Sequence, residues 1–473
     1  MREGGGPHPN EDPPDAVEGP GRRRAHFDRD WTEGNIVRNL WSLAWPMTVS
    51  GSVQMLGPTI DMIWVGKLGA ASMAGVGVAG MAVMVINAAR MGLNTGTRAM
   101  LARFVGAEDF EGANHIAQQA FVISVIFAAI MALVGIILAE QILMLLGVEE
   151  DVVSEGAAYM RIMFGGSIFM SFGMMAQGTM QAAGDTMSPM KITIATRIFH
   201  TMLCPFLIFG WWIFPRLGVS GSAITNIASQ GLGAGIMIWI LFSGRSRLKP
   251  TLKNFSFDGN IIWRIVKIGI PASVTGLERS LANFVLMWLI APFGTFAVAA
   301  HSLIQRVDTF IHMPAMGIGQ ASGILAGQNL GAGKPDRAER TGWISAGIFT
   351  CVMAVGAVVI WFWAENIVRI FNSEPELVKI AGGFLRIEIV NYMVFGPVII
   401  ITQCLNGIGD TIPTMLTTLV TMWGVQVPIA YFLPKITNLG VYGVRWGIVS
   451  AVAMRALIYS IYFKMGRWKR KEV

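Results

Sequence analysis

Apolar segments long enough to cross a lipid bilayer dominate this 473-residue chain, in which 53% of the residues are hydrophobic and only 14% are charged. A water-soluble domain cannot hide that much apolar surface at this charge density. A crossing helix needs about 20 apolar residues. By that measure we expect about twelve crossings, and the sequence predicts an all-α, polytopic membrane protein. The expected crossings are 39–64, 70–96, 116–138, 157–181, 192–214, 219–243, 266–290, 294–325, 341–363, 380–405, 412–433 and 441–463.

An internal repeat relates the two halves of the chain. A shift of 225 residues places Pro46 on Pro271 and the GDT turn at 184–186 on the GDT turn at 409–411, without a gap between these points. The last helix of each half follows the same pattern after a change of three residues in the register. Ungapped agreement of this length is typical of a duplicated unit, so we expect two similar halves of six helices each.

The even number of crossings in each half makes both halves enter the membrane in the same direction. We therefore expect two parallel six-helix bundles, related by an axis along the membrane normal and facing each other across a central cavity. The expected domains are a disordered cytoplasmic tail at 1–33, bundles at 34–243 and 259–465, a cytoplasmic linker at 244–258 and a basic cytoplasmic tail at 466–473.

The formal net charge of +7 reflects Lys and Arg residues between the apolar segments and at the chain ends. Because such residues set topology, we expect no nucleic-acid partner, and we expect both termini on the cytoplasmic side of a multi-pass protein in the cell (inner) membrane. Cys204, Cys351 and Cys404 lie in apolar runs and are interpreted as small hydrophobic residues. GVGVAG at 75–80 lies inside an apolar segment, and GQNLGAGKP at 327–335 lacks phosphate-loop spacing, so no cofactor and no metal site are expected.

Asp61 and Glu278 are carboxylates in the first apolar segment of each half. The shift of 225 places Asp61 on Leu286 and Glu278 on Val53, so each acid belongs to one half only. Features that both halves share indicate architecture, whereas a feature of one half alone is a candidate for function. Since a charge inside a membrane costs roughly 2.5–3.5 kcal/mol on the insertion scale, we interpret these acids as candidates for a cation site and a substrate-facing charge.

Structural explanations remain open for both acids. Asp61 can be a buried acid that neighbouring hydroxyls and the backbone near a proline satisfy. Glu278 can belong to a structural ion pair, because Arg279 follows it directly and Arg306 or Asp308 lies further along the chain.

Several motifs together resemble the multidrug and toxin extrusion (MATE) family of antiporters. The motifs are Pro46 followed fifteen residues later by Asp61, VGKLG at the end of the first segment, GIGQASGILAGQNLGAGKPDRAER after the eighth, and the two GDT turns. The resemblance extends from about Gly34 to Phe463. It implies that Asp61 corresponds to the aspartate of the N-terminal lobe that is implicated in coupling.

The resemblance also implies a secondary active antiporter and not an enzyme. We expect it to work as a monomer and to export organic compounds, expected to be cationic and amphipathic, in exchange for entering H+ or Na+. Pro46 and Pro58 are candidate bend points of the first helix, because each proline removes a backbone hydrogen bond.

The fifth segment departs from the family pattern. Archaeal-type relatives tend to show an asparagine and an aspartate four residues apart here, whereas this sequence has His200 and Cys204 before Pro205. A spacing of four places both side chains on one helix face. Losing two oxygen ligands weakens the sodium hypothesis, while a histidine near Asp61 suits a proton relay. The alternative is a hydrogen-bonded histidine with a structural role.

A lipid-linked sugar flippase of the same superfamily remains the alternative function. Such relatives often have additional helices and a cationic cavity, whereas the residues singled out in this sequence are mainly acidic. A membrane enzyme or receptor would need a polar catalytic cluster or a sizeable soluble domain, and the sequence indicates neither.

Overall fold

Helices make up every regular element in the part of the chain that the computed structural model describes, residues 30–145, 147, 149–250 and 255–471. The first half contains α2 (Ile36–Val65), η1 (Gly66–Leu68), α3 (Ala70–Gly106), α4 (Phe110–Leu145), α5 (Glu150–Gly165), α6 (Ser167–Ala182), α7 (Met187–Phe209) and α8 (Val219–Phe242). The second half contains α9 (Gly259–Ile290), η2 (Ala291–Phe293), α10 (Thr295–Gly331), α11 (Pro335–Phe371), α12 (Pro375–Ile408), α13 (Thr411–Thr421), η3 (Met422–Gln426), α14 (Val427–Ile436), α15 (Val441–Met465) and η4 (Arg467–Arg470).

The helices agree with the expectation of an all-α protein with about twelve crossings. Nine helical segments within the described residues are long and apolar enough to cross a membrane. The other three expected crossings are α2, α10 and segment 157–181. The first two carry buried polar groups such as Asp61 and His301, which lower their hydropathy. Segment 157–181 is divided at Gly166 into α5 and α6, of 16 residues each, so neither is long enough to count among the nine, and the crossing expected there stays a prediction.

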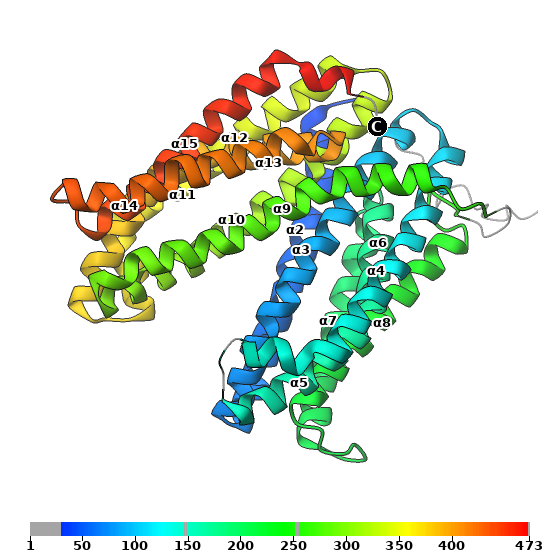
Figure 1. Ribbon diagram of the computed structural model, residues 1–473. Coiled ribbons are helices and arrows are strands. Elements are labelled where there is room, and N and C mark those ends of the chain that lie inside the picture. The colour runs from blue at the N-terminus through cyan, green and yellow to red at the C-terminus, as the bar shows by residue number, and fades with distance from the viewer. Residues whose placement is uncertain (1–29, 146, 148, 251–254, 472–473) are drawn as a thin grey trace, which may run out of the picture.

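The two halves form the arms of a V (Figure 1). They meet near the C-terminal end of the chain and diverge away from it, with the α2–α3 turn at the far end of one arm and the α9–α10 turn at the far end of the other. The arms contact each other where α3 packs on α9 and α2 packs on α10. The predicted boundaries of the tails and the linker stay predictions, because residues 1–29, 251–254 and 472–473 lie outside the described residues.

The contact between the arms follows the sequence repeat. Gly92 of α3 lies against Ser273 of α9, and Gly317 of α10 lies against Thr48 of α2, so closely that neither glycine has room for a β-carbon. The two glycines are related by the shift of 225, and so are Thr48 and Ser273. Equivalent residues of the two halves therefore make equivalent contacts across a pseudo-twofold axis, as the repeat predicts.

Candidate functional site

Asp61 lies on α2, one turn after Pro58, with a relative exposure of 2%. Its Oδ1 accepts a hydrogen bond from the Ser222 hydroxyl at 3.0 Å and one from the Cys204 thiol at 3.6 Å. Its Oδ2 accepts one from the Asn226 amide nitrogen at 3.4 Å. Donors from α7 and α8 thus surround a single buried carboxylate.

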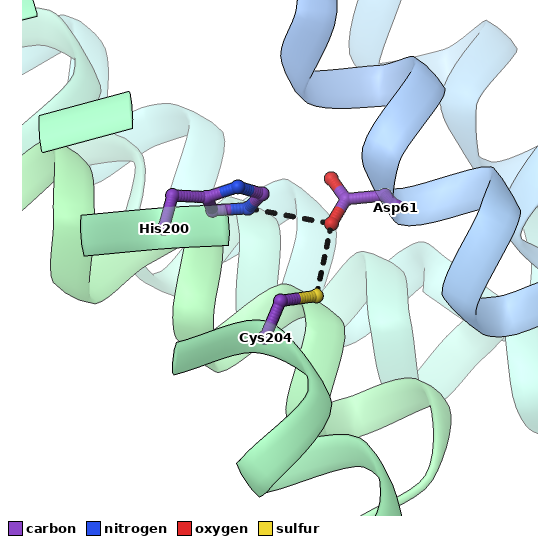
Figure 2. A group of neighbouring side chains, drawn as sticks. All are labelled: Asp61, His200 and Cys204. Carbon is purple, nitrogen blue, oxygen red and sulfur yellow. Dashed lines mark hydrogen bonds and ion pairs between the residues drawn. The ribbon is translucent and has the colours of Figure 1, made fainter. Parts of the chain in front are cut away.

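His200 approaches the same carboxylate from α7, as Figure 2 shows. Its Nε2 lies 3.3 Å from Asp61 Oδ1, and the ring is fully buried. His200 and Cys204 are one helical turn apart and face Asp61 together. The structure therefore brings together Asp61 and His200, two of the candidate site residues, and Cys204, which the sequence placed on the same helix face as His200.

A cavity of about 590 Å³ opens beside this cluster, within the first half of the molecule. Helices α2, α3, α5, α6, α7 and α8 line it, and Asp61 and Asn226 form part of its wall. Methionines supply much of the remaining surface, and their flexible thioethers suit ligands of varied shape. These methionines are Met62, Met84, Met91, Met163, Met170, Met174 and Met237.

Two arginines also line the cavity. The Arg90 Nε donates to the Ser171 hydroxyl at 3.1 Å, and its Nη1 donates to the Asn87 side chain at 2.7 Å. Arg197 places Nη1 3.5 Å from His200 Nδ1. Asp61 of the same wall acts electrostatically on Arg197, so the cavity wall carries charge of both signs.

Glu278 lies in the other arm, on α9, and does not line this cavity. It is 7% exposed, and its Oε1 has no hydrogen-bond partner among the residues that the structure describes. Arg455 and Arg279 are the cations that act on it electrostatically. The neighbour Arg279 was among the expected partners, whereas Asp308 instead accepts a hydrogen bond from Tyr392.

Pro46 and Pro58 both lie inside α2, which continues through them from Ile36 to Val65. Pro46 is buried, and Pro58 lines the cavity. Their role as bend points stays a prediction.

Four polar residues of the site were given no role from sequence, although the comparison between halves could have indicated one. Each is replaced by an apolar residue at the equivalent position of the second half, with the three-residue change of register applied to α8. The pairs are Arg90 and Ala315, Arg197 and Met422, Ser222 and Val444, and Asn226 and Ile448.

Comparison with known proteins agrees with this architecture. The chain is 25% identical over 444 residues to the "Probable multidrug resistance protein YoeA" of Bacillus subtilis (strain 168), with 93% of this chain and 96% of that protein covered. It is 25% identical to the "FAD transporter" of Shewanella oneidensis, with 84% and 87% covered. The fold matches a crystal structure of MATE in the bent conformation with a TM-score of 0.86 at 24% identity, covering 92% of this chain and 96% of that one.

A family model described as MatE matches residues 46–206 and again residues 271–432. The two matches fall on the two halves of the repeat and together cover more than half of the chain. The chain therefore belongs to the MatE family of multidrug and toxin extrusion transporters.

Proposed function

We propose that this protein is a secondary active antiporter that exports organic compounds in exchange for entering H+ or Na+. The observation that carries the proposal is the buried Asp61 carboxylate, which lies at the wall of a cavity and has no acidic equivalent in the other half. We further propose that the protein acts as a monomer in the cell (inner) membrane with both termini in the cytoplasm.

Coupling requires that the cation favour one conformation of the first half. A cation on Asp61 neutralises the carboxylate and changes its contacts with Ser222 on α8 and with Cys204 on α7. Because these contacts join three helices around the cavity, occupancy can alter the cavity's shape. An ion that bound every conformation equally could drive no transport.

The residues that line the cavity indicate which class of compound it can bind. Its volume and its methionine-rich surface suit amphipathic organic compounds. The preference for cationic compounds stays a prediction that Asp61 supports, whereas Arg90 and Arg197 suit compounds with an anionic group. The Shewanella relative is named an FAD transporter, and FAD carries a pyrophosphate, so anionic compounds belong in any test.

The comparisons do not favour the alternative of a lipid-linked sugar flippase. The relative from Bacillus subtilis is named a multidrug resistance protein, and family membership points to a transporter rather than to an enzyme.

The decisive experiment measures efflux of cationic, neutral and anionic dyes from cells that express the protein. The assay is repeated with sodium removed and with the proton gradient collapsed. We expect efflux of part of the panel to stop under one of these conditions. Efflux that persists under both would exclude H+ and Na+ as coupling ions.

Asp61→Asn tests the site itself. The amide keeps the size of the side chain and can still accept from Ser222, but it binds neither a proton nor a metal cation as a carboxylate does. In inside-out vesicles we expect substrate-driven ion flux to be lost while the variant still inserts in the membrane. Unchanged flux would remove Asp61 from the coupling mechanism.

A further inference from the structure

Asp61, His200 and Cys204 direct three different ligand atoms toward one region. A carboxylate oxygen, an imidazole nitrogen and a thiol sulfur lie within 4.8 Å of one another, and all three residues are buried. From sequence we expected no metal site. The structure brings the ligands together from two helices (Figure 2), and we propose that they bind a transition-metal dication that accepts oxygen, nitrogen and sulfur ligands, such as Zn²⁺ or Co²⁺.

The two separations between Asp61 Oδ1 and the other ligand atoms fit tetrahedral coordination. Bond lengths of about 2.0–2.1 Å to nitrogen and oxygen and about 2.3 Å to sulfur place neighbouring ligands about 3.3 Å (nitrogen to oxygen) and about 3.6 Å (sulfur to oxygen) apart. The structure has His200 Nε2 at 3.3 Å and Cys204 Sγ at 3.6 Å from Asp61 Oδ1. The third pair, His200 Nε2 and Cys204 Sγ, lies within 4.8 Å, so these two side chains must turn toward each other when an ion binds.

The His200 ring gives an independent indication. Its Nε2 is buried and makes no hydrogen bond with any described residue, and its contact with Asp61 Oδ1 at 3.3 Å has the distance of an ion pair only. A buried polar atom without a hydrogen bond costs free energy. His200 Nε2 and Asp61 Oδ1 are therefore close together without being aligned for a hydrogen bond. Two neighbouring ligands of one metal ion have this arrangement.

The donor set selects the class of cation. Na⁺ and Mg²⁺ prefer several oxygen ligands, whereas a thiolate and an imidazole suit borderline and soft ions. Metal binding would release the proton that the Cys204 thiol donates to Asp61, and the resulting thiolate and the carboxylate together neutralise a dication. This matters because Arg197 lies beside His200 and acts on Asp61 electrostatically, so a net positive charge in the cluster would be repelled.

The surroundings supply access and a fourth ligand. Asp61 lines the cavity, so an ion can reach it from there. The Ser222 hydroxyl, 3.0 Å from Asp61 Oδ1, or a water from the cavity can take the fourth position. Metal binding at Nε2 places the ring proton on Nδ1, so Arg197 must turn from His200 toward the Gln54 carbonyl oxygen, which its Nη2 already contacts at 3.4 Å.

Metal binding does not depend on transport, so it can be tested without a transport assay. The full-length protein, purified in detergent without a histidine tag, is titrated with CoCl₂ while the absorption spectrum is recorded. We expect one Co²⁺ per chain, with the visible bands of tetrahedral cobalt and the near-ultraviolet charge-transfer band of a cobalt–thiolate bond. ZnCl₂ should displace the cobalt and abolish both signals.

Variants assign the signal to the cluster. Cys204→Ser should abolish the charge-transfer band and weaken Co²⁺ binding about 10–100-fold, and His200→Gln should weaken it similarly. Cys404→Ser is the matched control, since Cys404 is also fully buried but lies in the second half. It should keep the wild-type spectrum and affinity.

Arg197→Gln provides a test with the opposite expectation. An amide oxygen can accept the Nδ1 proton, and the positive charge is gone, so we expect Co²⁺ to bind more tightly. The proposal is overturned if wild-type protein gives no charge-transfer band, or if Cys204→Ser and Cys404→Ser behave alike. Since Cys204→Ser keeps Asp61, its loss of cobalt binding would leave the proposed antiport mechanism untouched, whereas failure of antiport would appear in the Asp61→Asn vesicle assay.

Discussion

Glu388 and Arg445 form an ion pair in the interior of the second half. Arg445 Nη1 donates to Glu388 Oε1 at 2.9 Å. Both side chains are almost fully buried, with 1% of the Glu388 side chain and 2% of the Arg445 side chain exposed. Asn391 donates to the other carboxylate oxygen at 2.7 Å. Glu388→Gln removes the carboxylate that Arg445 hydrogen-bonds, and within the described residues Asp308, which acts on Arg445 electrostatically, makes no ion pair with it. We predict a loss of about 3–5 kcal/mol in stability, visible as a lower thermal unfolding midpoint in detergent.

The matched control is an exposed ion pair between Arg386, which lies on α12 as Glu388 does, and Glu365 of α11. Arg386 lies 3.1 Å from Glu365, with 46% and 43% of the side chains exposed, and surface pairs contribute only about 0–1 kcal/mol. Arg386→Gln should therefore barely move the midpoint. If Glu388→Gln lowers the midpoint as little as Arg386→Gln does, the Arg445 charge is not buried in the way the structure indicates.

At the scale of single residues, the sequence predicts which groups are unusual better than it predicts their partners. Asp61 stands out because an acid in an apolar helix is costly and the second half lacks it. Its partner Ser222 lies 161 residues further along the chain, so only the packing of α2 against α7 and α8 brings them together. Glu388 likewise pairs with Arg445, 57 residues away, and not with its sequence neighbour Arg386.

At the scale of helices, the glycines at the contact between the arms set how closely α3 and α9 approach. A methyl group on Gly92 would overlap the Ser273 side chain and the Gly269 carbonyl oxygen. We predict that Gly92→Ala costs about 1–3 kcal/mol, as overpacking does, and lowers the thermal midpoint. Gly347→Ala on α11 is the control, because a methyl group there meets nothing within 4 Å. Equal midpoints for the two variants would contradict the close contact.

Hydropathy locates the helices but not their interruptions. Segment 157–181 is mostly apolar, with Arg161 as its one charged residue, yet it divides at Gly166. Segment 412–433 contains a π-helical turn, Met422–Gln426, at the positions equivalent to 197–201 of α7. The mean apolarity of a segment carries no information about local hydrogen bonding, so both interruptions needed the three-dimensional structure.

At the scale of the whole molecule, the repeat predicts the relation between the arms well. Arg161 pairs with Glu140 at 2.9 Å and Arg386 pairs with Glu365 at 3.1 Å, and the shift of 225 relates the two pairs. The repeat cannot predict at which end the two arms meet, because two equivalent units can contact each other at either end. It also gives no reason for the cavity beside Asp61 to lie within the first half, which follows from side chains that the halves do not share.

Ala88 on α3 and Gly276 on α9 face each other across the contact between the arms. A β-carbon on Gly276 would lie 3.4 Å from that of Ala88, close to the separation of about 3.5–4.5 Å that a disulfide needs. A disulfide at this point joins the two halves without touching the Asp61 cluster. It therefore restricts movement between the arms but leaves ion binding inside the first half unaffected.

If transport requires the arms to move against each other, this disulfide should stop it. We predict that oxidised Ala88→Cys/Gly276→Cys protein, in a background with the exposed Cys351 replaced by serine, loses most of its dye efflux. Reduction should restore efflux in the same sample, and each single-cysteine variant should be insensitive to oxidant. Cobalt binding should survive cross-linking, because its ligands all lie in one arm. Full efflux from the cross-linked protein would mean that α3 and α9 keep their contact throughout the cycle, and that access to the cavity changes by movements within a half.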